Sequence, residues 1–410
     1  MKTAHMNENG AIDLVCFGGE DWWYHNRGHI DMQLMRRFAG SGRVLYINSI
    51  MMRKVNIGEG GMFIKRVKRK FASVRRGLVE AESGFFVYSP LTFPVHHLPV
   101  ASGLNQLGLR LQASRAARFL SLSRPVVWVA CPAACSSALR LERRALVYQR
   151  TDRYEEYPGV DRRIIAGLDK RLKETADITF YVNRSLYDEE APSCRCARLI
   201  DHGVDYDMFA SAVESDRIPP EMQGITRPVV GFFGGIDDHT CDMPLLEEVA
   251  GLAPEMTFVL IGSASSDTTR IGRLSNVHLL GKRPYEQIPH YGKCFDVAIM
   301  PWRQNRWIEA CNPIKLKEYL ALGRPVVSTP FSELERYRSL VYVAGDPRGF
   351  TEAIRRAVRE DDDARRRARR EAVMHDTWQA RAGEVLAALG EAGKGRDREP
   401  HTSVSRCRNS

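Results

Sequence analysis

Short runs of apolar residues, many of them β-branched or aromatic, recur along this chain and alternate with stretches of helical periodicity. The first half contains LVCF, VLYI, FFVY, VVWVA, ALVY and ITFYV in that order. Runs that are apolar throughout are typical of parallel strands whose two faces are both covered. Strands that alternate with helices form a doubly wound α/β sheet. The first half is therefore predicted to be a Rossmann-like α/β domain.

The same alternation of apolar runs and helical stretches begins again after the polar, proline-containing stretch ASAVESDRIPPEMQGITRP. The later runs are VVGFF, TFVLIG, NVHLLG, FDVAIMP, RPVVST and LVYVAG. A chain of 410 residues is long enough for two domains of ordinary size. We expect an N-terminal domain over 1–215, a C-terminal domain over 226–374, a helix over 375–392 and a disordered tail over 393–410.

Composition places the chain among soluble globular proteins, since 44% of its residues are hydrophobic and 27% are charged. An uncharged apolar run of about 18 residues, which a membrane-spanning helix needs, is absent from the sequence. The N-terminal MKTAHMNENGAIDLV lacks the charged-then-apolar order of a secretion signal. The expected location is therefore the cytoplasm.

The net charge of +10 is concentrated in one segment, because residues 53–76 hold nine Lys or Arg residues and one acidic residue. An apolar stripe at helical spacing follows the same segment through Phe63, Val67, Phe71, Val74 and Leu78. A basic amphipathic helix over 62–79 can bind an anionic membrane surface. The alternative is a helix packed on the core with a solvated basic face. A nucleic-acid partner is not expected, since no recognised nucleic-acid module accompanies the basic segment, which extends over 53–79.

A second helix is predicted within EACNPIKLKEYLALGRPVVST, directly after the apolar run FDVAIMP. Asn312 suits the N-cap, Pro313 the first helical position, and Gly323 the end of the helix. Helix N-termini at the carboxyl ends of strands favour anions. With Lys315 in its first turn, the start of this helix is a suitable binding site for a diphosphate.

Glu318 lies three positions after Lys315 and so shares nearly the same helix face. Its carboxylate could accept hydrogen bonds from both hydroxyls of a ribose. Gly234 and Gly235 follow the run VVGFF, where they would let backbone N–H groups approach a pyrophosphate. The spacing alone is equally compatible with an ordinary capped surface helix and an ordinary glycine turn.

The segment NPIKLKEYLALGRPVVST, preceded by PWRQN and followed by PFSEL, resembles the signature of bacterial glycosyltransferases close to the family-4 retaining type. That group includes enzymes of teichuronic-acid and exopolysaccharide assembly. The order of motifs over roughly residues 12–385, among them VVGFFGGIDDHTCDMPLLEEVA and ALVYQRTDRYEEY, is similar as well. In the group, a Glu at the place of Glu318 holds the ribose of the donor nucleotide, and the helix start holds its diphosphate.

The resemblance implies a GT-B fold, with two Rossmann-like domains facing across a cleft and the C-terminal helix returning to the N-terminal domain. It implies a retaining transfer of sugar from a nucleotide-diphosphate-sugar, the co-substrate, to a glycan or lipid-linked acceptor in cell-envelope polysaccharide synthesis. Neither a metal nor a further cofactor is expected, and the enzyme could lie peripherally on the inner face of the plasma membrane. The loop that carries Gly18, Gly19, Arg27 and His29 would face the cleft, although Arg27 and His29 equally suit an ordinary helix start.

Two departures from the group's pattern concern the donor sugar and its phosphates. The Glu that the group has eight positions before its ribose-binding Glu is Ala310 here, with Glu309 beside it, and no cation follows Gly234 and Gly235. Lys315 and Arg303 are predicted to take the catalytic, phosphate-binding role. A sugar-nucleotide epimerase and a non-catalytic nucleotide-binding module remain as alternatives. Residues 205–207 (DYD) imitate a metal-binding motif, but we assign them to a turn.

Overall fold

The computed structural model describes residues 12–25, 28–48, 50, 52, 61–93 and 99–396, and it divides the chain into two compact units. The first unit consists of the residues up to Asp201 and those from Arg381 on, and the second is His202–Ala380. The division falls earlier than the predicted boundary at 215. The reason is that α7 (Tyr206–Glu214) packs against α9 (Ile288–Gly292) and α11 (Ile314–Ala321) of the second unit.

The first unit contains an eight-stranded sheet in the order β3-β4-β2-β1-β5-β6-β7-β8. Every neighbouring pair is parallel except β3 with β4. All six predicted runs of the first half are strands, so the doubly wound class is confirmed, whereas β3 and β8 were not predicted. The strands are β1 (Leu14–Phe17), β2 (Val44–Ile47), β3 (Leu78–Glu82), β4 (Phe85–Tyr88), β5 (Val126–Val129), β6 (Ala145–Arg150), β7 (Ile178–Tyr181) and β8 (Ala197–Leu199).

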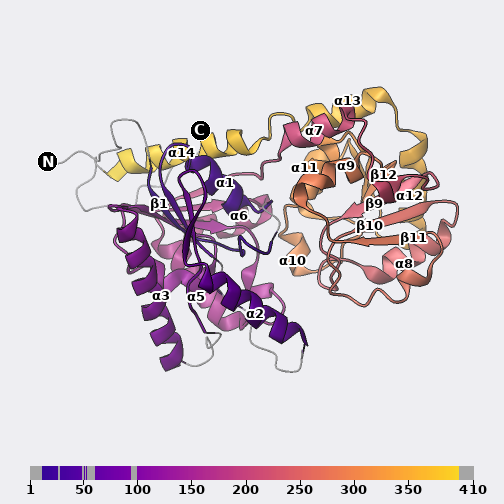
Figure 1. The fold of residues 1–410 in the computed structure, drawn as a ribbon. Helices are drawn as coiled ribbons and strands as arrows, with labels where there is room; N and C mark the ends of the chain where they lie inside the picture. Colours follow the sequence, from indigo (N-terminus) through magenta and orange to yellow (C-terminus); the bar gives the residue numbers. More distant parts are fainter. Residues whose placement is uncertain are drawn as a thin grey trace. The chain divides into compact units, whose positions relative to one another are not determined.

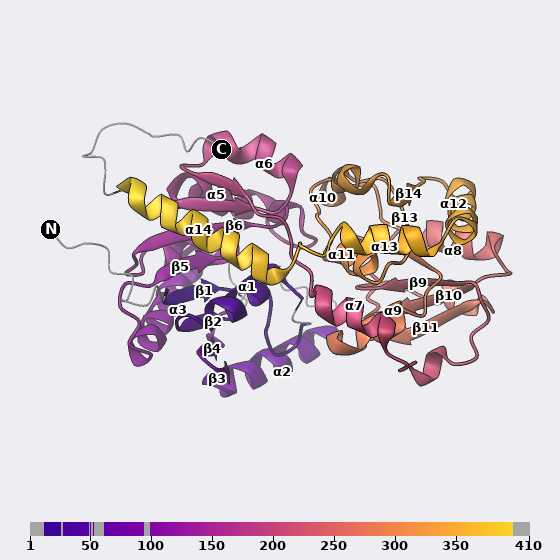
Figure 2. The ribbon, with the colours of Figure 1, turned by 90° about the horizontal axis from the view of Figure 1, so that it is seen from above.

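Helices cover this sheet, and the last helix of the chain joins them. Figure 2 shows α14 (Trp378–Arg396) lying along the first unit, where Glu391 pairs with Arg198 at 3.6 Å. The helix includes the first four residues of the predicted tail, 393–396, and residues 397–410 lie outside the described residues. The other helices are α1 (Ile30–Phe38), α2 (Gly61–Arg75), α3 (Pro99–Phe119), α4 (Cys135–Ala138), α5 (Arg162–Thr175) and α6 (Arg184–Glu190).

The basic helix is shorter than its apolar stripe predicts. It ends at Arg75, and Gly77 adopts a φ of +66°, a value that favours glycine and turns the chain into β3. Leu78 therefore belongs to a strand that pairs antiparallel with β4, and the prediction of one helix over 62–79 is wrong at its C-terminal end. Residues 53–60 lie outside the described part of the chain.

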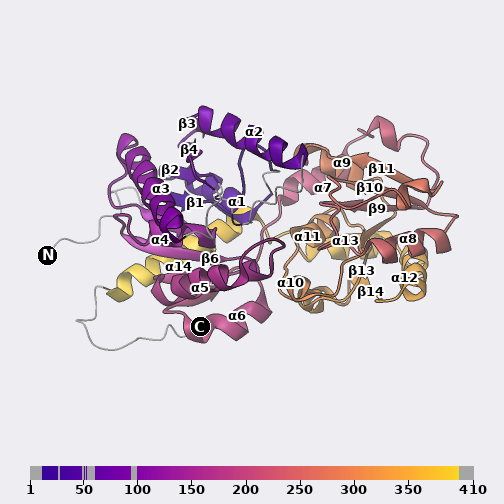
Figure 3. The same ribbon diagram turned by 90° about the horizontal axis from the view of Figure 1, so that it is seen from below.

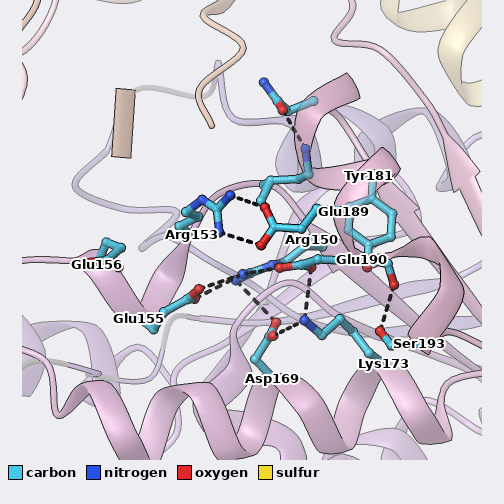
Figure 4. A network of polar contacts seen from close by, with 12 residues as sticks. Arg150, Arg153, Glu155, Glu156, Asp169, Lys173, Tyr181, Glu189, Glu190 and Ser193 are labelled. Carbon is cyan, nitrogen blue, oxygen red and sulfur yellow. Dashed lines mark hydrogen bonds and ion pairs between the residues drawn. The ribbon is translucent and has the colours of Figure 1, made fainter. Parts of the chain in front are cut away.

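A cluster of buried charges ties β6 to α5 and α6 (Figure 4). Arg150 is fully buried at the end of β6, and it pairs with Glu155 at 3.0 Å, Glu190 at 3.0 Å and Asp169 at 3.3 Å. Lys173 pairs with Asp169 at 2.7 Å and with Glu190 at 3.1 Å. Because every charge has opposite partners, the cluster is best explained as a structural one that fixes where the strand and both helices meet.

The second unit contains a fully parallel six-stranded sheet in the order β11-β10-β9-β12-β13-β14. The order of strands reverses between β9 and β12. Ligands of open α/β sheets bind outside the carboxyl ends of the strands at such a reversal. The strands are β9 (Val229–Phe233), β10 (Thr257–Ile261), β11 (Val277–Gly281), β12 (Val297–Met300), β13 (Val326–Ser328) and β14 (Val341–Val343).

Two helical layers cover the second sheet, as Figure 3 shows. On one side, α8 (Met243–Leu252) and α12 (Pro347–Arg359) pack together over a core of Val230, Phe258 and Ile299. On the other side, α11 packs against α7 and against α13 (Asp363–Glu371). The short helix α10 (Arg306–Glu309) precedes α11 in the loop after β12. This arrangement brings the start of α11 to the carboxyl ends of β9 and β12.

Candidate functional site

The turn after β9 makes room for a lysine side chain. Gly234 has a φ of +147°, and a Cβ atom on it would lie 2.3 Å from Nζ of Lys315. Any larger residue would therefore displace this ammonium group. Gly235 has no such crowding, since its nearest neighbour would be Asp237 Oδ2 at 3.3 Å. The glycine turn after β9 and the Lys315 helix thus meet in the structure.

Helix α11 begins slightly later than predicted. Its N-cap position is Pro313, with a ψ of 120° and no side-chain cap, and Asn312 lies two positions before the first helical residue. The predicted N-cap at Asn312 is therefore wrong, whereas Gly323 ends the helix with a φ of +70°, as predicted. Among the described residues, no acceptor is recorded for the amides of Ile314 and Lys315, as first-turn geometry leads one to expect.

The ammonium group of Lys315 rests against aromatic rings. Its Nζ lies 4.4 Å from the ring centre of Phe232 and 5.6 Å from that of Trp302. Within the described part of the chain, no carboxylate lies at ion-pair distance from it. Burial lowers the pKa of Lys315, and the nearby Cys241 and Glu318 offset this effect only in part. The aromatic rings thus hold a cation whose charge no described carboxylate neutralises at ion-pair distance.

Tyr319 holds this helix to the end of β9. It lies one turn after Lys315, and its hydroxyl oxygen accepts a hydrogen bond from the amide of Phe233 at 3.0 Å. Residues four apart share a helix face, so Lys315 and Tyr319 both point toward the strand end. Tyr319 was not among the predicted site residues, although its spacing of four residues from Lys315 places both side chains on one helix face.

Glu318 is buried, with 6% of its surface exposed, and it accepts a hydrogen bond from the Tyr285 hydroxyl at 2.8 Å. Tyr285 comes from the short helical turn after β11 and was not predicted. Burial raises the pKa of Glu318 to about 7, and the hydrogen bond from Tyr285 and the charge of Lys315 oppose that rise. Among the described residues, the structure records no further hydrogen bond to this carboxylate, so its second oxygen could accept one from a ligand.

The raised pKa of Glu318 leads to a prediction about stability. A carboxyl group with a pKa near 4.5 when unfolded and about 7 when folded loses its contribution as pH rises through 7, because its burial then requires a buried charge. Glu318→Gln carries no charge at any pH. Its stability relative to wild type should therefore rise between pH 5 and pH 8, by about 2.5 kcal/mol. Urea titrations of the apo protein at both pH values measure this difference, and a pH-independent difference would contradict it.

Arg303 lies in the same group of loops as Lys315. Its Nε donates to the carbonyl oxygen of Cys241 at 3.3 Å, and the Cys241 thiol in turn contacts the carbonyl of Gly235 at 3.4 Å. Ala310 is buried with 1% of its surface exposed, and Glu309 beside it is exposed. The structure therefore puts no carboxylate at the place of Ala310.

The remaining predicted residues belong to the first unit. A Cβ atom on Gly18 would lie 2.1 Å from the ring of Tyr46, so this glycine has a packing role. The amide of Gly19 donates to Asp31 at 2.8 Å, and Tyr46 donates to the same carboxylate oxygen at 2.7 Å. His29 is exposed at the start of α1. Arg27 lies outside the described residues.

A comparison with protein families shows what the segment that carries this site is similar to. A model of the family described as glycosyl transferases group 1 matches residues 227–360, which include Gly234, Lys315 and Glu318. The second unit therefore resembles a glycosyl transferases group 1 domain over these residues. The matched segment covers the whole six-stranded sheet, together with the strand reversal at which Lys315 lies.

Similar proteins extend the likeness beyond residues 227–360. The Bacillus subtilis (strain 168) protein TuaH, named as a teichuronic acid biosynthesis glycosyltransferase, is 28% identical over 243 residues. That match spans 56% of this chain and 60% of TuaH, so the chain covers about three fifths of this relative's length.

Solved structures show the fold of both units. Anabaena HepE in complex with UDP has a TM-score of 0.63 and 15% identity, over 93% of this chain and 99% of that one. Sucrose-phosphate synthase from Thermosynechococcus elongatus has a TM-score of 0.69 and 14% identity, over 93% of this chain and 100% of that one. The fold class is therefore GT-B, with two Rossmann-like units, and the chain resembles glycosyltransferases of that class.

Proposed function

We propose that this protein transfers a sugar from a nucleotide-diphosphate-sugar to a glycan or lipid-linked acceptor in polysaccharide synthesis. One observation carries the proposal: Lys315, a cation without a carboxylate partner in the described part of the chain, lies where the strand order of a group 1 domain reverses. The UDP complex of the similar HepE supports a nucleotide donor. The likeness to TuaH supports a role in polysaccharide synthesis.

The donor diphosphate would lie against Lys315 and the first-turn amides of α11. Both present positive charge, and the missing side-chain cap leaves those amides available to an anion. Gly234 and Gly235 would let the ligand approach the end of β9, and Arg303 would supply a second cation. The free carboxylate oxygen of Glu318 would accept hydrogen bonds from the donor ribose.

Catalysis would come from charge that is fixed before the reaction begins. The departing nucleoside diphosphate gains negative charge as the glycosidic bond breaks, so cations that hold it more tightly at that moment lower the barrier. No step of this scheme requires a divalent metal, and we propose that activity persists in EDTA. We further propose retention of the anomeric configuration, which proton NMR of the product tests; an inverted linkage would overturn that part.

Binding of the donor can be tested without knowing the acceptor. A nucleotide that binds only the folded protein stabilises it by about 2.7 kcal/mol at 100 times its Kd. A thermal-shift series with UDP, GDP, ADP and TDP sugars should therefore reveal one preferred base. Release of free nucleotide that requires an added acceptor would support transfer, whereas conversion of the donor sugar without any acceptor would indicate an epimerase.

Loss of the Glu318 carboxylate is expected to weaken donor binding. Glu318→Ala removes an acceptor of charge-assisted hydrogen bonds, each of which contributes about 1.5–3 kcal/mol, so the donor KM should rise roughly 10- to 100-fold. Because the ionised carboxylate is the better acceptor, the wild-type KM should fall as pH rises through about 7. Initial rates at varied donor concentration measure both effects. Glu352→Ala, on the exposed part of α12, is the control and should leave the KM unchanged.

We also propose that an anionic membrane surface is a partner of the first unit. Among the described residues, no helix has the length and apolar character needed to cross a membrane. A lipid-linked acceptor would nonetheless be presented at a bilayer surface. The exposed part of α2 carries Lys68 and Arg69 beside Phe71, a combination that suits such a surface.

A further inference from the structure

The sheet of the second unit ends in an edge strand that lacks the usual protection against pairing. Strand β14 has the residues VYV, without a charged side chain, and its register with β13 is regular. Figures 2 and 3 both show it at the outer margin of the second unit. Edge strands commonly carry charges, bulges or a covering helix, because their free backbone groups can pair with another chain.

The other edge strands of the two sheets each show such a device. Strand β3 carries Glu80 and Glu82, and its register with β4 shifts between them. In β8, Arg198 pairs with Glu391 of α14 at 3.6 Å. The pairing of β11 with β10 also shifts its register. Among the described strands, β14 is therefore the edge most open to a partner.

The backbone of β14 presents hydrogen-bonding groups at this open edge. On the inner side, the amide of Ala344 donates to the carbonyl of Ser328 at 3.1 Å. In a parallel pair, alternate residues bond to the same neighbour, so Val341 and Val343 direct their N–H and C=O groups away from β13. The side chain of Val343 is 46% exposed. The edge thus offers a partner both backbone groups and an apolar side chain.

A cavity of about 510 Å³ opens beside β14, between α12 and the short helix Ser332–Tyr337. The Ser332 hydroxyl donates to the carbonyl of Glu309 at 2.9 Å, and the Tyr342 hydroxyl donates to Glu360 at 2.8 Å. These bonds fix two walls of the cavity, which lowers the cost of association. The apolar part of its lining consists of Phe331, Leu334, Val341, Tyr342 and Ala353.

Both signs of charge lie at or next to the rim of this cavity. Arg338 pairs with Glu335 at 3.0 Å, and Arg356 pairs with Glu360 at 3.3 Å. Ion pairs as exposed as these stabilise the fold little, so they can exchange partners at small cost. A strongly charged partner would gain little from such a balanced rim. A second copy of the same surface would match it, because a two-fold rotation brings cations of one copy to acids of the other.

We infer that β14 and its cavity form the interface of a two-fold dimer, in which β14 pairs antiparallel with β14 of a second copy. Val341 of each copy would lie opposite Val343 of the other, and the two residues would exchange both N–H···O bonds. Because Val341 lines the cavity, this register brings the exposed Val343 side chain of the second copy to it. The inference goes beyond the proposed function and does not depend on it.

The same cavity lies next to the candidate donor site. Phe331 in its lining packs on Trp302, with ring centres 5.1 Å apart, and Trp302 flanks Lys315. A second copy at the cavity would therefore lie against one wall of that site.

Sedimentation velocity of the full chain, without any substrate, tests this inference. The wild type should pass from monomer to dimer as its concentration rises. Val343→Arg should weaken dimerisation at least about tenfold, because it places a cation against the apolar lining of the other copy. Leu279→Arg is the matched control, since Leu279 is 39% exposed on β11 at the opposite edge of the same sheet. This variant should dimerise like the wild type.

A second variant tests the backbone pairing itself. Val343→Pro removes an N–H group that faces the open edge, a position at which a strand tolerates proline. The variant should keep the circular dichroism spectrum of the wild type and dimerise several-fold more weakly. Hydrogen exchange of the wild type locates the interface, because the amide of Val343 should exchange more slowly at concentrations at which the dimer forms.

Two results would overturn the inference. One is a wild type that stays monomeric at every concentration, which would leave β14 to an extended segment of another protein. The other is a dimer that persists undiminished in Val343→Arg, which would place the interface elsewhere. A missing thermal shift with nucleotide sugars would contradict the proposed function and leave both of these measurements unaffected.

Discussion

Replacing Lys315 with methionine is expected to lower kcat by roughly 10²- to 10³-fold, the usual effect of removing one fixed charge-stabilising group from a transition state. The negative charge on the departing diphosphate is largest at the transition state. Phe232 and Trp302 hold the ammonium group in place before the donor arrives. Methionine keeps most of the aliphatic chain that packs on these rings. The donor KM should change much less than kcat, and steady-state rates at varied donor concentration separate the two.

Two controls make this result specific to the charge. Lys170→Met removes an exposed lysine of α5 and should leave kcat unchanged. The apo form of Lys315→Met should be no less stable than the wild type, because burial already disfavours the cation, as its lowered pKa shows. A variant with wild-type kcat would remove Lys315 from the catalytic scheme. A variant that loses both activity and folded structure would show that Lys315 stabilises the apo fold instead.

Most strands of this fold could be predicted because each of them leaves a continuous apolar run. Parallel strands in the middle of a sheet are covered on both faces, and LVCF and VVGFF coincide with β1 and β9 residue for residue. The two strands that were missed lack this property. In β3 the residues LVEAE are half-exposed and include two acids, and β8 has only three residues. Edge strands of this kind leave too weak a pattern to be read from sequence.

Some residues of the candidate site could likewise be predicted from local sequence patterns, whereas others depend on contacts between distant parts of the chain. Gly234, Lys315 and Glu318 could be proposed because each lies in a turn or on a helix face that local patterns and the family resemblance indicate. Tyr285 and Trp302 come from the loops after two other strands. Their approach to Glu318 and Lys315 depends on the order of strands in the sheet. No spacing along the chain carries that information, so the structure was needed to find them.

Lys317 is the clearest example of a role that the sequence alone does not reveal. It lies between two predicted site residues and looks like a solvent-exposed lysine in the sequence. Its side chain is 2% exposed and points away from the donor side of α11. The ammonium group donates to the carbonyl of His202 at 2.6 Å, 115 positions away, and pairs with Asp376 at 2.9 Å. The backbone also joins these segments, since the amide of Val204 donates to Asp376 at 2.8 Å. Lys317 thus ties α11 to the two places where the chain enters and leaves the second unit.

Lys317→Met is expected to destabilise the second unit by about 3–5 kcal/mol, the usual consequence of removing one partner of a buried ion pair. The change leaves the carboxylate of Asp376 buried, with Tyr337 at 3.3 Å and the half-exposed Arg336 at 3.2 Å among its remaining partners. Urea unfolding followed by circular dichroism measures the loss. Because the chain has two units, the transition should be fitted for each unit separately.

An exposed ion pair of the same length provides the control. Arg355 and Glu255 also approach to 2.9 Å, but their side chains are 37% and 50% exposed. Arg355→Met should therefore cost only about 0–1 kcal/mol. Equal losses in Lys317→Met and Arg355→Met would show that burial does not determine the effect, and they would contradict the role assigned to Lys317.

The double variant Lys317→Met with Asp376→Leu distinguishes the two sources of the loss. If the unpaired buried carboxylate causes it, removal of that carboxylate should restore part of the stability, since apolar residues can replace a buried ion pair with little net change. If the loss arises instead from the hydrogen bond to the carbonyl of His202, the double variant should be no more stable than Lys317→Met. Restored stability would mean that the ion pair adds little net stability to the fold. Its main role would then be to fix the position of α11, which carries Lys315 and Glu318.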